Sequence, residues 1–155
     1  MKPSHETKVN AVPEGYHSIT PYLKLPQAGR LVEFLKSAFG GTETARLTKP
    51  DGTLLHAEVR IGDSLVMVHE APSHWKPKPC TLYLYVGDVD ATYKLALQAG
   101  GLSVTEPGNM YYGDRVACVR DVSGNDWWIA TRLETTTLEE MQKRAAAFLE
   151  ARSKV

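Results

Sequence analysis

The chain of 155 residues has the length of one domain, and its 43% hydrophobic and 23% charged content is that of an ordinary globular protein. Eighteen Lys and Arg residues balance eighteen Asp and Glu residues, and no basic block argues for a nucleic acid or an anionic membrane surface as partner. Neither a membrane-spanning apolar run nor an apolar signal segment is visible, so we expect a cytoplasmic protein.

The first structured segment follows a polar arm, residues 1–15, which contains two prolines and is expected to be flexible. Residues 20–41, "TPYLKLPQAGRLVEFLKSAFGG", predict a strand, a turn, an amphipathic helix and a glycine stop. Short β-like runs with turn signals at Asp51-Gly52 and Gly62-Asp63 follow. The apolar face of the predicted helix contains Leu31, Phe34, Leu35 and Ala38.

A second copy of this pattern begins at residue 81, after the proline-rich linker "APSHWKPKPC". Residues 81–101, "TLYLYVGDVDATYKLALQAGG", repeat the strand, turn, helix and glycine stop, with a helix face of Tyr93, Leu95, Ala96 and Ala99. Each copy predicts a strand–helix–strand–strand–strand module, at about residues 18–71 and 80–133. Residues matched at an offset of 61 positions are Thr20/Thr81, Tyr22/Tyr83, Leu23/Leu84, Ala38/Ala99 and Gly40/Gly101.

The predicted fold is α+β: two tandem βαβββ modules form a cupped mixed sheet with helices outside. Residues 16–135 are expected to be a single domain in which the modules pair strand edge to strand edge. Residues 136–155 predict a C-terminal helix, because Thr137 and Glu140 have capping-box spacing. Its apolar stripe would contain Leu138, Met141, Ala145, Phe148 and Leu149.

Several stretches resemble the vicinal-oxygen-chelate superfamily of glyoxalases, bleomycin-resistance proteins and dioxygenases, and most of all its PhnB-like branch. They are "ITPYLKL", "FLKSAFGG", "DGTLLHAEVRIGDSLVMVHE", "LYVGDVDATYKLALQAGG", "YGDRVACVRDVSGNDWWIATRLE" and "EEMQKR", spread over roughly residues 18–144. The resemblance implies the cupped fold and a two-fold homodimer with cups completed across the interface. It does not imply one function, because the superfamily carries several chemistries on one scaffold.

The resemblance also implies four positions for a divalent metal, on the first and last strand of each module. In this sequence they are Thr20, Thr81, Val66 or Met67, and Trp128. None is a usual metal ligand. We therefore expect no metal, no other cofactor and none of the metal-dependent enzyme chemistry of the superfamily, and we assign no catalytic residue.

Two further groups leave alternatives open. His56 and Glu58 share one strand face, where His56 is either a structural histidine or part of a pocket, and a non-standard metal site including both is the enzyme alternative. In "YYGDR", Tyr112 and Arg115 either contact a ligand at the mouth of the cup, or Arg115 pairs with Asp114 or Asp121.

In the strand after residue 125, Trp127 and Trp128 must face opposite ways, and we expect Trp127 to face the helices. Aromatic side chains facing the cup predict a pocket for a flat apolar or aromatic small organic molecule. We expect a metal-free small-molecule-binding protein. The alternatives are a glyoxalase- or dioxygenase-like lyase or oxidoreductase with a non-standard metal, and a structural or regulatory module with a filled cup. The candidate ligand-binding residues are His56, Glu58, Met67, Trp75, Tyr83, Tyr85, Tyr112, Arg115 and Trp128.

Overall fold

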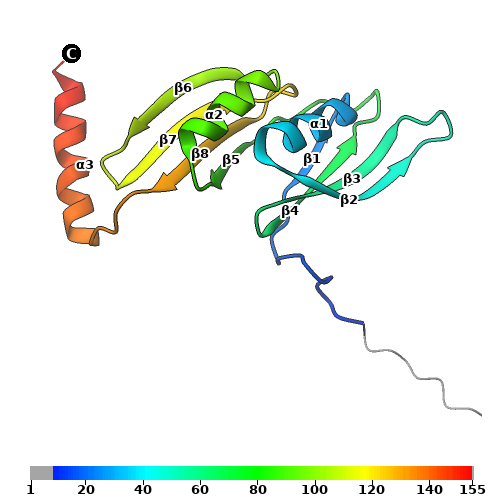
Figure 1. Ribbon diagram of the computed structural model, residues 1–155, viewed down its shortest axis with the longest axis horizontal. Helices are drawn as coiled ribbons and strands as arrows, with labels where there is room; N and C mark the ends of the chain where they lie inside the picture. Colours follow the sequence, from blue (N-terminus) through cyan, green and yellow to red (C-terminus); the bar gives the residue numbers. More distant parts are fainter. Residues whose placement is uncertain (1–8, 155) are drawn as a thin grey trace, which may run out of the picture.

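The computed structural model describes residues 9–154, which form two βαβββ modules followed by a helix (Figure 1). The first module contains β1 (Tyr22–Leu25), α1 (Ala28–Phe39), β2 (Thr42–Thr48), β3 (Leu54–Ile61) and β4 (Ser64–Glu70). The second contains β5 (Thr81–Tyr85), α2 (Val89–Gln98), β6 (Leu102–Asn109), β7 (Asp114–Arg120) and β8 (Asp126–Arg132), and α3 (Leu138–Ser153) ends the chain. The predicted α+β class and the tandem modules are confirmed.

The two modules have the same sheet topology. Sheet A has the strand order β1-β4-β3-β2 and sheet B the order β5-β8-β7-β6; the first pair in each is parallel and the others are antiparallel. Tyr22 lies opposite Met67 in sheet A, and Tyr83 lies opposite Trp128 in sheet B. Since both pairs are related by the same 61-residue offset, Met67 rather than Val66 is the counterpart of Trp128.

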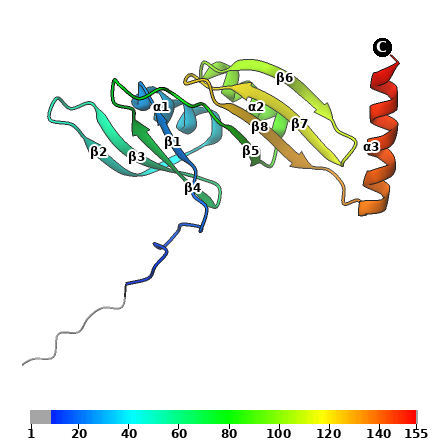
Figure 2. The same ribbon diagram turned by 180° about the vertical axis from the view of Figure 1, so that it is seen from behind.

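One face of each sheet is covered by a helix and the other is open. Helices α1 and α2 lie in front of the strands in Figure 1 and behind them in Figure 2, so both open faces are on the same side of the molecule. Alternation along β3 produces this division, because Ala57, Val59 and Ile61 are buried under the helices while His56 and Glu58 point to the open face.

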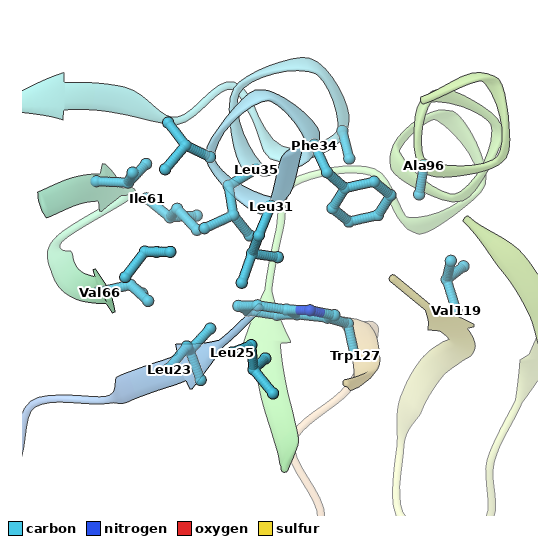
Figure 3. Close-up of a cluster of buried hydrophobic side chains, with 14 of the residues drawn as sticks. Leu23, Leu25, Leu31, Phe34, Leu35, Ile61, Val66, Ala96, Val119 and Trp127 are labelled. Carbon is cyan, nitrogen blue, oxygen red and sulfur yellow. The ribbon is translucent and has the colours of Figure 1, made fainter. Parts of the chain in front are cut away.

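The modules meet through their helices and a shared core. Among residues 9–154 the strands form two separate sheets, so the expected edge-to-edge pairing of the modules is not formed. Trp127 of β8 instead extends into the first module, where its ring lies near Leu25 and Leu31 (Figure 3) and 4.9 Å from the ring centroid of Phe39. Trp127 is 3% exposed, which confirms its predicted helix-facing orientation.

The two covering helices differ in how well their sequence pattern predicts burial. All four expected core positions of α1 are buried. In α2 the buried residues are Val89 and Ala96, which are two helical turns apart, whereas Leu95 is 47% exposed. The prediction that Leu95 lies on the buried face of α2 is therefore wrong.

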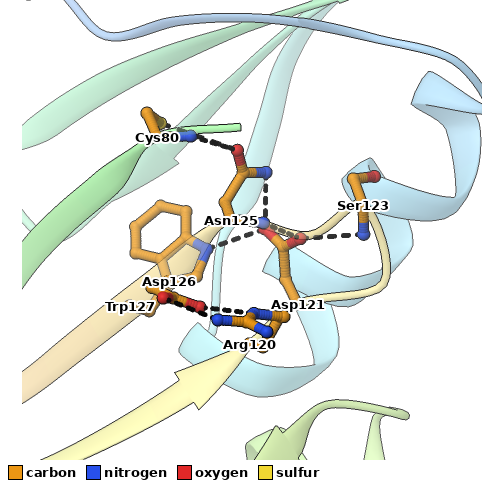
Figure 4. A network of polar contacts seen from close by, with 7 residues as sticks. All are labelled: Cys80, Arg120, Asp121, Ser123, Asn125, Asp126 and Trp127. Atoms are coloured by element: carbon orange, nitrogen blue, oxygen red, sulfur yellow. Dashed lines mark hydrogen bonds and ion pairs between the residues drawn. The ribbon is translucent and has the colours of Figure 1, made fainter. Parts of the chain in front are cut away.

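The turn between β7 and β8 is built around a buried carboxylate (Figure 4). Asp121, 4% exposed, accepts hydrogen bonds from the backbone N–H of Ser123 and Asn125, the Asn125 side chain and the Trp127 indole, at 2.8–3.0 Å. Asn125 in turn accepts from the backbone N–H of Cys80 at 3.0 Å. This network ties the start of β5 and β8 to the turn and satisfies the buried polar groups.

The described segments before β1 and after β8 lie outside the sheets. Helix α3 begins as predicted, with the Thr137 hydroxyl accepting from the Glu140 N–H at 3.1 Å, and stands beside sheet B (Figure 1). Leu138 and Leu149 on its expected apolar stripe are 81% and 66% exposed. Residues 1–8 of the expected arm lie outside the described residues. None of the described helices is long and apolar enough to cross a lipid bilayer.

Candidate functional site

The open face of sheet B carries a hollow of about 450 Å³ walled by tyrosines, which we call the tyrosine hollow. The hollow is formed by residues of four elements, β5, β7, β8 and α3, and of the turn that precedes β7. Its lining residues are Tyr83, Tyr85, Tyr111, Tyr112, Asp114, Arg132 and Met141.

Strand alternation and register bring these side chains together. Tyr83 and Tyr85 are two residues apart on β5, so both point to the open face, with ring centroids 5.3 Å apart. Arg132 at the end of β8 lies directly opposite Asp114 at the start of β7. The face therefore combines two aromatic rings of the edge strand with a charged pair at the end of the central strands.

The polar floor of the hollow is the Asp114 carboxylate, which is 1% exposed. It accepts hydrogen bonds from Arg132 Nε at 3.0 Å and from the Tyr85 hydroxyl at 3.1 Å, with the Tyr83 hydroxyl at 3.4 Å. The buried carboxylate is thus paired and hydrogen-bonded, as a charge in this environment requires. Burial, followed by the interactions with Tyr112 and Asp114, raises the pKa of Tyr83 well above its ordinary value, so its hydroxyl stays protonated.

The wall of the hollow on the C-terminal side is formed by α3. The Tyr111 ring lies 5.0 Å from the ring of Phe148 and 5.2 Å from that of Tyr112. Arg144 donates to the Tyr111 carbonyl at 3.4 Å and to Glu140 at 3.0 Å. Helix α3 is therefore attached to the hollow by a few aromatic and polar contacts rather than by a buried core.

Trp128 extends the aromatic surface toward the middle of sheet B. It lies opposite Tyr83 on β5 and Cys118 on β7, and is half-buried. Cys118 beneath this face is fully buried, and burial raises the pKa of its thiol to about 11. A thiol held in the neutral form is a poor nucleophile, so nothing here indicates cysteine chemistry.

Arg115 lies away from the hollow, on the helix-covered side of β7. Its guanidinium makes a two-point ion pair with Asp90 of α2, at 2.6 and 2.9 Å, and donates to Asn109 at 2.9 Å. Neither partner expected from the sequence is used, because Asp114 pairs with Arg132 and Asp121 is enclosed by N–H donors. Arg115 is therefore not part of the site. The residues of "YYGDR" that line the hollow include both tyrosines, Tyr111 and Tyr112.

The open face of sheet A has a second group of side chains, centred on two histidines. His56 of β3 and His69 of β4 lie opposite each other, with their Nδ1 atoms 3.3 Å apart. Glu58 Oε1 is 3.8 Å from the Nε2 of His56, and the Tyr22 ring centroid is 5.9 Å from that of His69. Burial, the neighbouring His56 and then Lys24 lower the pKa of His69.

Two segments outside the strands reach this second group. Trp75 of the linker lies under the Lys24 ammonium, 4.1 Å from it to the ring centroid. Tyr16 lies near Glu58, and burial, followed by the interaction with this carboxylate, raises the pKa of Tyr16 to about 12. His56, Glu58 and Met67 thus share one open face, with Trp75 at its edge, while Tyr83, Tyr85, Tyr112 and Trp128 share the other.

Several residues of the two open faces were not predicted from the sequence. His69 is one of them, and it lies on the open face because it is two residues from Met67 on β4. Glu70, its neighbour, accepts from the N–H groups of Gln27 and Ala28 at 3.1 and 2.7 Å and caps α1. Asp114 and Arg132 carry no local sequence signal, since only the β7–β8 register brings them together.

The family's metal positions do not fit a metal here. Met67 and Trp128 occupy equivalent places on the two open faces, and Thr20 and Thr81 supply only hydroxyls. In the part of the chain described, residues 9–154, no group of three or more His, Cys, Asp or Glu side chains converges on one point. The side chains at these family positions therefore cannot form the carboxylate- and imidazole-rich site that such chemistry needs.

Comparison with known proteins identifies a family. The family model described as the Glyoxalase/Bleomycin resistance protein/Dioxygenase superfamily matches residues 25–129. An uncharacterized protein of Mycobacterium bovis is 31% identical over 136 residues, which cover 81% of this chain and 90% of that protein.

Solved structures show the same fold. TioX from Micromonospora sp. ML1 has 26% sequence identity and a TM-score of 0.64, covering 74% of this chain and 98% of its own. A glyoxalase/bleomycin resistance protein/dioxygenase family enzyme from Burkholderia phytofirmans PsJN has 18% identity and a TM-score of 0.60, with 74% and 96% covered. At that identity the second similarity concerns the fold alone.

Proposed function

The chain belongs to the Glyoxalase/Bleomycin resistance protein/Dioxygenase superfamily, and from that premise we propose that it is a cytoplasmic small-molecule-binding protein. Its ligand is a flat aromatic or heteroaromatic molecule held in the tyrosine hollow, without a metal. We place the chain in the PhnB-like branch on the sequence stretches that resemble it.

The observation that carries the proposal is the combination of exposed aromatic rings with a fully paired polar floor. Tyr83 and Tyr85 are 46% and 57% exposed although their hydroxyls are anchored to the buried Asp114. Rings held at one end and uncovered on their faces are preorganised to stack on a planar ligand. The half-exposed Arg132 supplies N–H donors at the rim for a ligand acceptor.

A homodimer completes the proposed site. Both open faces carry uncovered aromatic side chains, including Tyr22, Trp75 and Tyr83, which are 51%, 41% and 46% exposed. Two chains related by a two-fold axis could set sheet A of one against sheet B of the other and cover both faces at once. Sedimentation equilibrium on the full chain tests this assembly, and a monomer at all concentrations would contradict it.

Ligand binding is tested by fluorescence titration with a panel of planar aromatic compounds, using Trp128 beside the hollow as reporter. We expect saturable quenching and a rise in melting temperature for at least one compound, because stacking in the hollow stabilises the folded chain. Tyr85→Ala should weaken binding about 5- to 150-fold, because losing one aromatic stack on a planar ligand costs about 1–3 kcal/mol.

The matched control is Tyr93→Ala, since Tyr93 lies on α2 and bonds to Ser103 away from the hollow. Equal losses in both variants would contradict the hollow as the site. No saturable binding by any compound would favour the structural or regulatory alternative with a filled cup. Turnover of a compound that depends on added metal would favour the enzyme alternative.

A further inference from the structure

Two histidine side chains on sheet A face each other at the ends of paired strands. His56 and His69 are directly opposite in the β3–β4 ladder, and both are half-buried. Their rings are tilted by 56° with centroids 5.5 Å apart, and their Nδ1 atoms approach to 3.3 Å. Each neutral imidazole has only one N–H, so one Nδ1 must donate to the other in the absence of a third atom.

The spacing of these two nitrogens is that of two ligands on one metal. Nitrogens bound to Zn²⁺ at about 2.0–2.1 Å with a tetrahedral angle are separated by about 3.3 Å. We propose that His56 and His69 form a two-histidine site for a borderline divalent metal ion such as Zn²⁺. This site lies on the open face of sheet A and is separate from the tyrosine hollow on sheet B.

A carboxylate lies near the other ring nitrogen of His56. Glu58 Oε1 is 3.8 Å from His56 Nε2, which is the nitrogen that points away from His69. At 3.8 Å the carboxylate is beyond hydrogen-bond distance, but its charge favours a ring proton on Nε2, which leaves the Nδ1 lone pair for the metal. When the ion enters, His69 loses its Nδ1 proton and takes up one at Nε2, so a neutral ring releases no net proton.

The neighbouring side chains affect how strongly the two histidines can bind an ion. The Tyr22 ring forms one wall, with its centroid 6.5 and 5.9 Å from those of His56 and His69. Lys24 lies opposite His69 in the β1–β4 pair, so its positive charge opposes a cation bound there. Because the described residues, 9–154, bring no third ligand to the pair, water must complete the coordination, and we expect weaker binding than at a closed four-ligand site.

The test uses the full chain stripped by chelation and titrated with Zn²⁺ or Co²⁺ alone, followed by calorimetry and by the visible absorption of cobalt. We expect one ion per chain. His56→Gln and His69→Gln should each lower the affinity more than tenfold, and Glu58→Gln by about tenfold, the lower end for loss of an outer partner. His17→Gln and His74→Gln are the matched controls, because both side chains are exposed and outside the pair, and they should leave binding unchanged.

A spectroscopic measurement on the unaltered chain makes the result independent of how the variants fold. Long-range ¹H–¹⁵N spectra should show Zn²⁺ shifting the Nδ1 resonances of two imidazoles, with both protons on Nε2. No saturable binding, or binding that the control variants abolish and His56→Gln and His69→Gln retain, would overturn the proposal. Loss of ligand binding in the tyrosine hollow would not affect it, because the two sites share no residue.

Discussion

The indole N–H of Trp127 donates to the Asp121 carboxylate at 2.8 Å, and both side chains are almost completely buried. This contact anchors the first tryptophan of β8 between the two modules. Because neighbouring residues of a strand point to opposite faces, it also directs Trp128 to the open face beside Tyr83. One buried hydrogen bond thus couples the module junction to the orientation of the proposed ligand surface.

Removing the acceptor of that bond should destabilise the fold. Asp121→Ala leaves the Trp127 indole, the Asn125 amide and two backbone N–H groups without a partner, and each unmet buried donor costs about 1–3 kcal/mol. We expect a loss of at least about 3 kcal/mol in urea unfolding. Asp126→Asn is the control, because its pair with Arg120 is partly exposed and should contribute under about 1 kcal/mol. Equal losses would contradict a special role for Asp121.

Two glycines should respond to alanine in opposite directions. A Cβ at Gly101 would lie 2.5 Å from Val119 Cγ1 and 2.9 Å from the Ala96 carbonyl oxygen, so Gly101→Ala should cost about 1–3 kcal/mol. Gly29 lies inside α1 with nothing within 4 Å of its built Cβ, so Gly29→Ala should stabilise by about 0.5–1 kcal/mol. Thermal melts should show a lower melting temperature for Gly101→Ala and a higher one for Gly29→Ala. Destabilisation by Gly29→Ala would contradict the expected gain in helix stability.

The carboxylate of Glu70 should contribute to stability through α1. It accepts from the N–H groups of the N-cap residue Gln27 and the first helical residue Ala28, and lies at the positive end of the helix dipole. Glu70→Ala should therefore cost about 1–2 kcal/mol in chemical denaturation. Glu33→Ala is a suitable control, because Glu33 is exposed on the same helix and pairs only with Lys36 in the described part of the chain. If the control lost as much stability, the capping role would be wrong.

Tyr16 should make stability depend on pH in the alkaline range. Its pKa rises from the ordinary value of 10.0 to about 12 in the folded chain. The folded state thus favours the neutral phenol, and the resulting stabilisation is complete below pH 10 and is lost as the pH rises through about 12. Tyr16→Phe should remove one late step from the tyrosinate absorbance titration and flatten this part of the stability curve. An unchanged titration would contradict the contact with Glu58.

Strand alternation explains how much of the site could be predicted. Residues two apart on a strand share a face, and the repeat shows which strands are equivalent. The sequence could therefore predict two groups of residues that share a face: His56, Glu58 and Met67 on one sheet, and Tyr83, Tyr85 and Trp128 on the other. Arg115 shows the limit of this reasoning. Its position next to Asp114 suggested a local partner, but adjacent strand residues face opposite ways, and α2 supplies Asp90 on the covered side.

The sequence by itself determined the periodic features: two βαβββ modules, the burial of α1, the cap of α3 and the opposite orientations of Trp127 and Trp128. These depend on local patterns of period 2 and 3.6 and on short-range hydrogen bonds. Only the tertiary structure decided that the modules join through helices and Trp127 rather than strand edges, and that Asp114 meets Arg132 and His56 meets His69. Such pairs depend on strand register across turns, which local patterns do not specify.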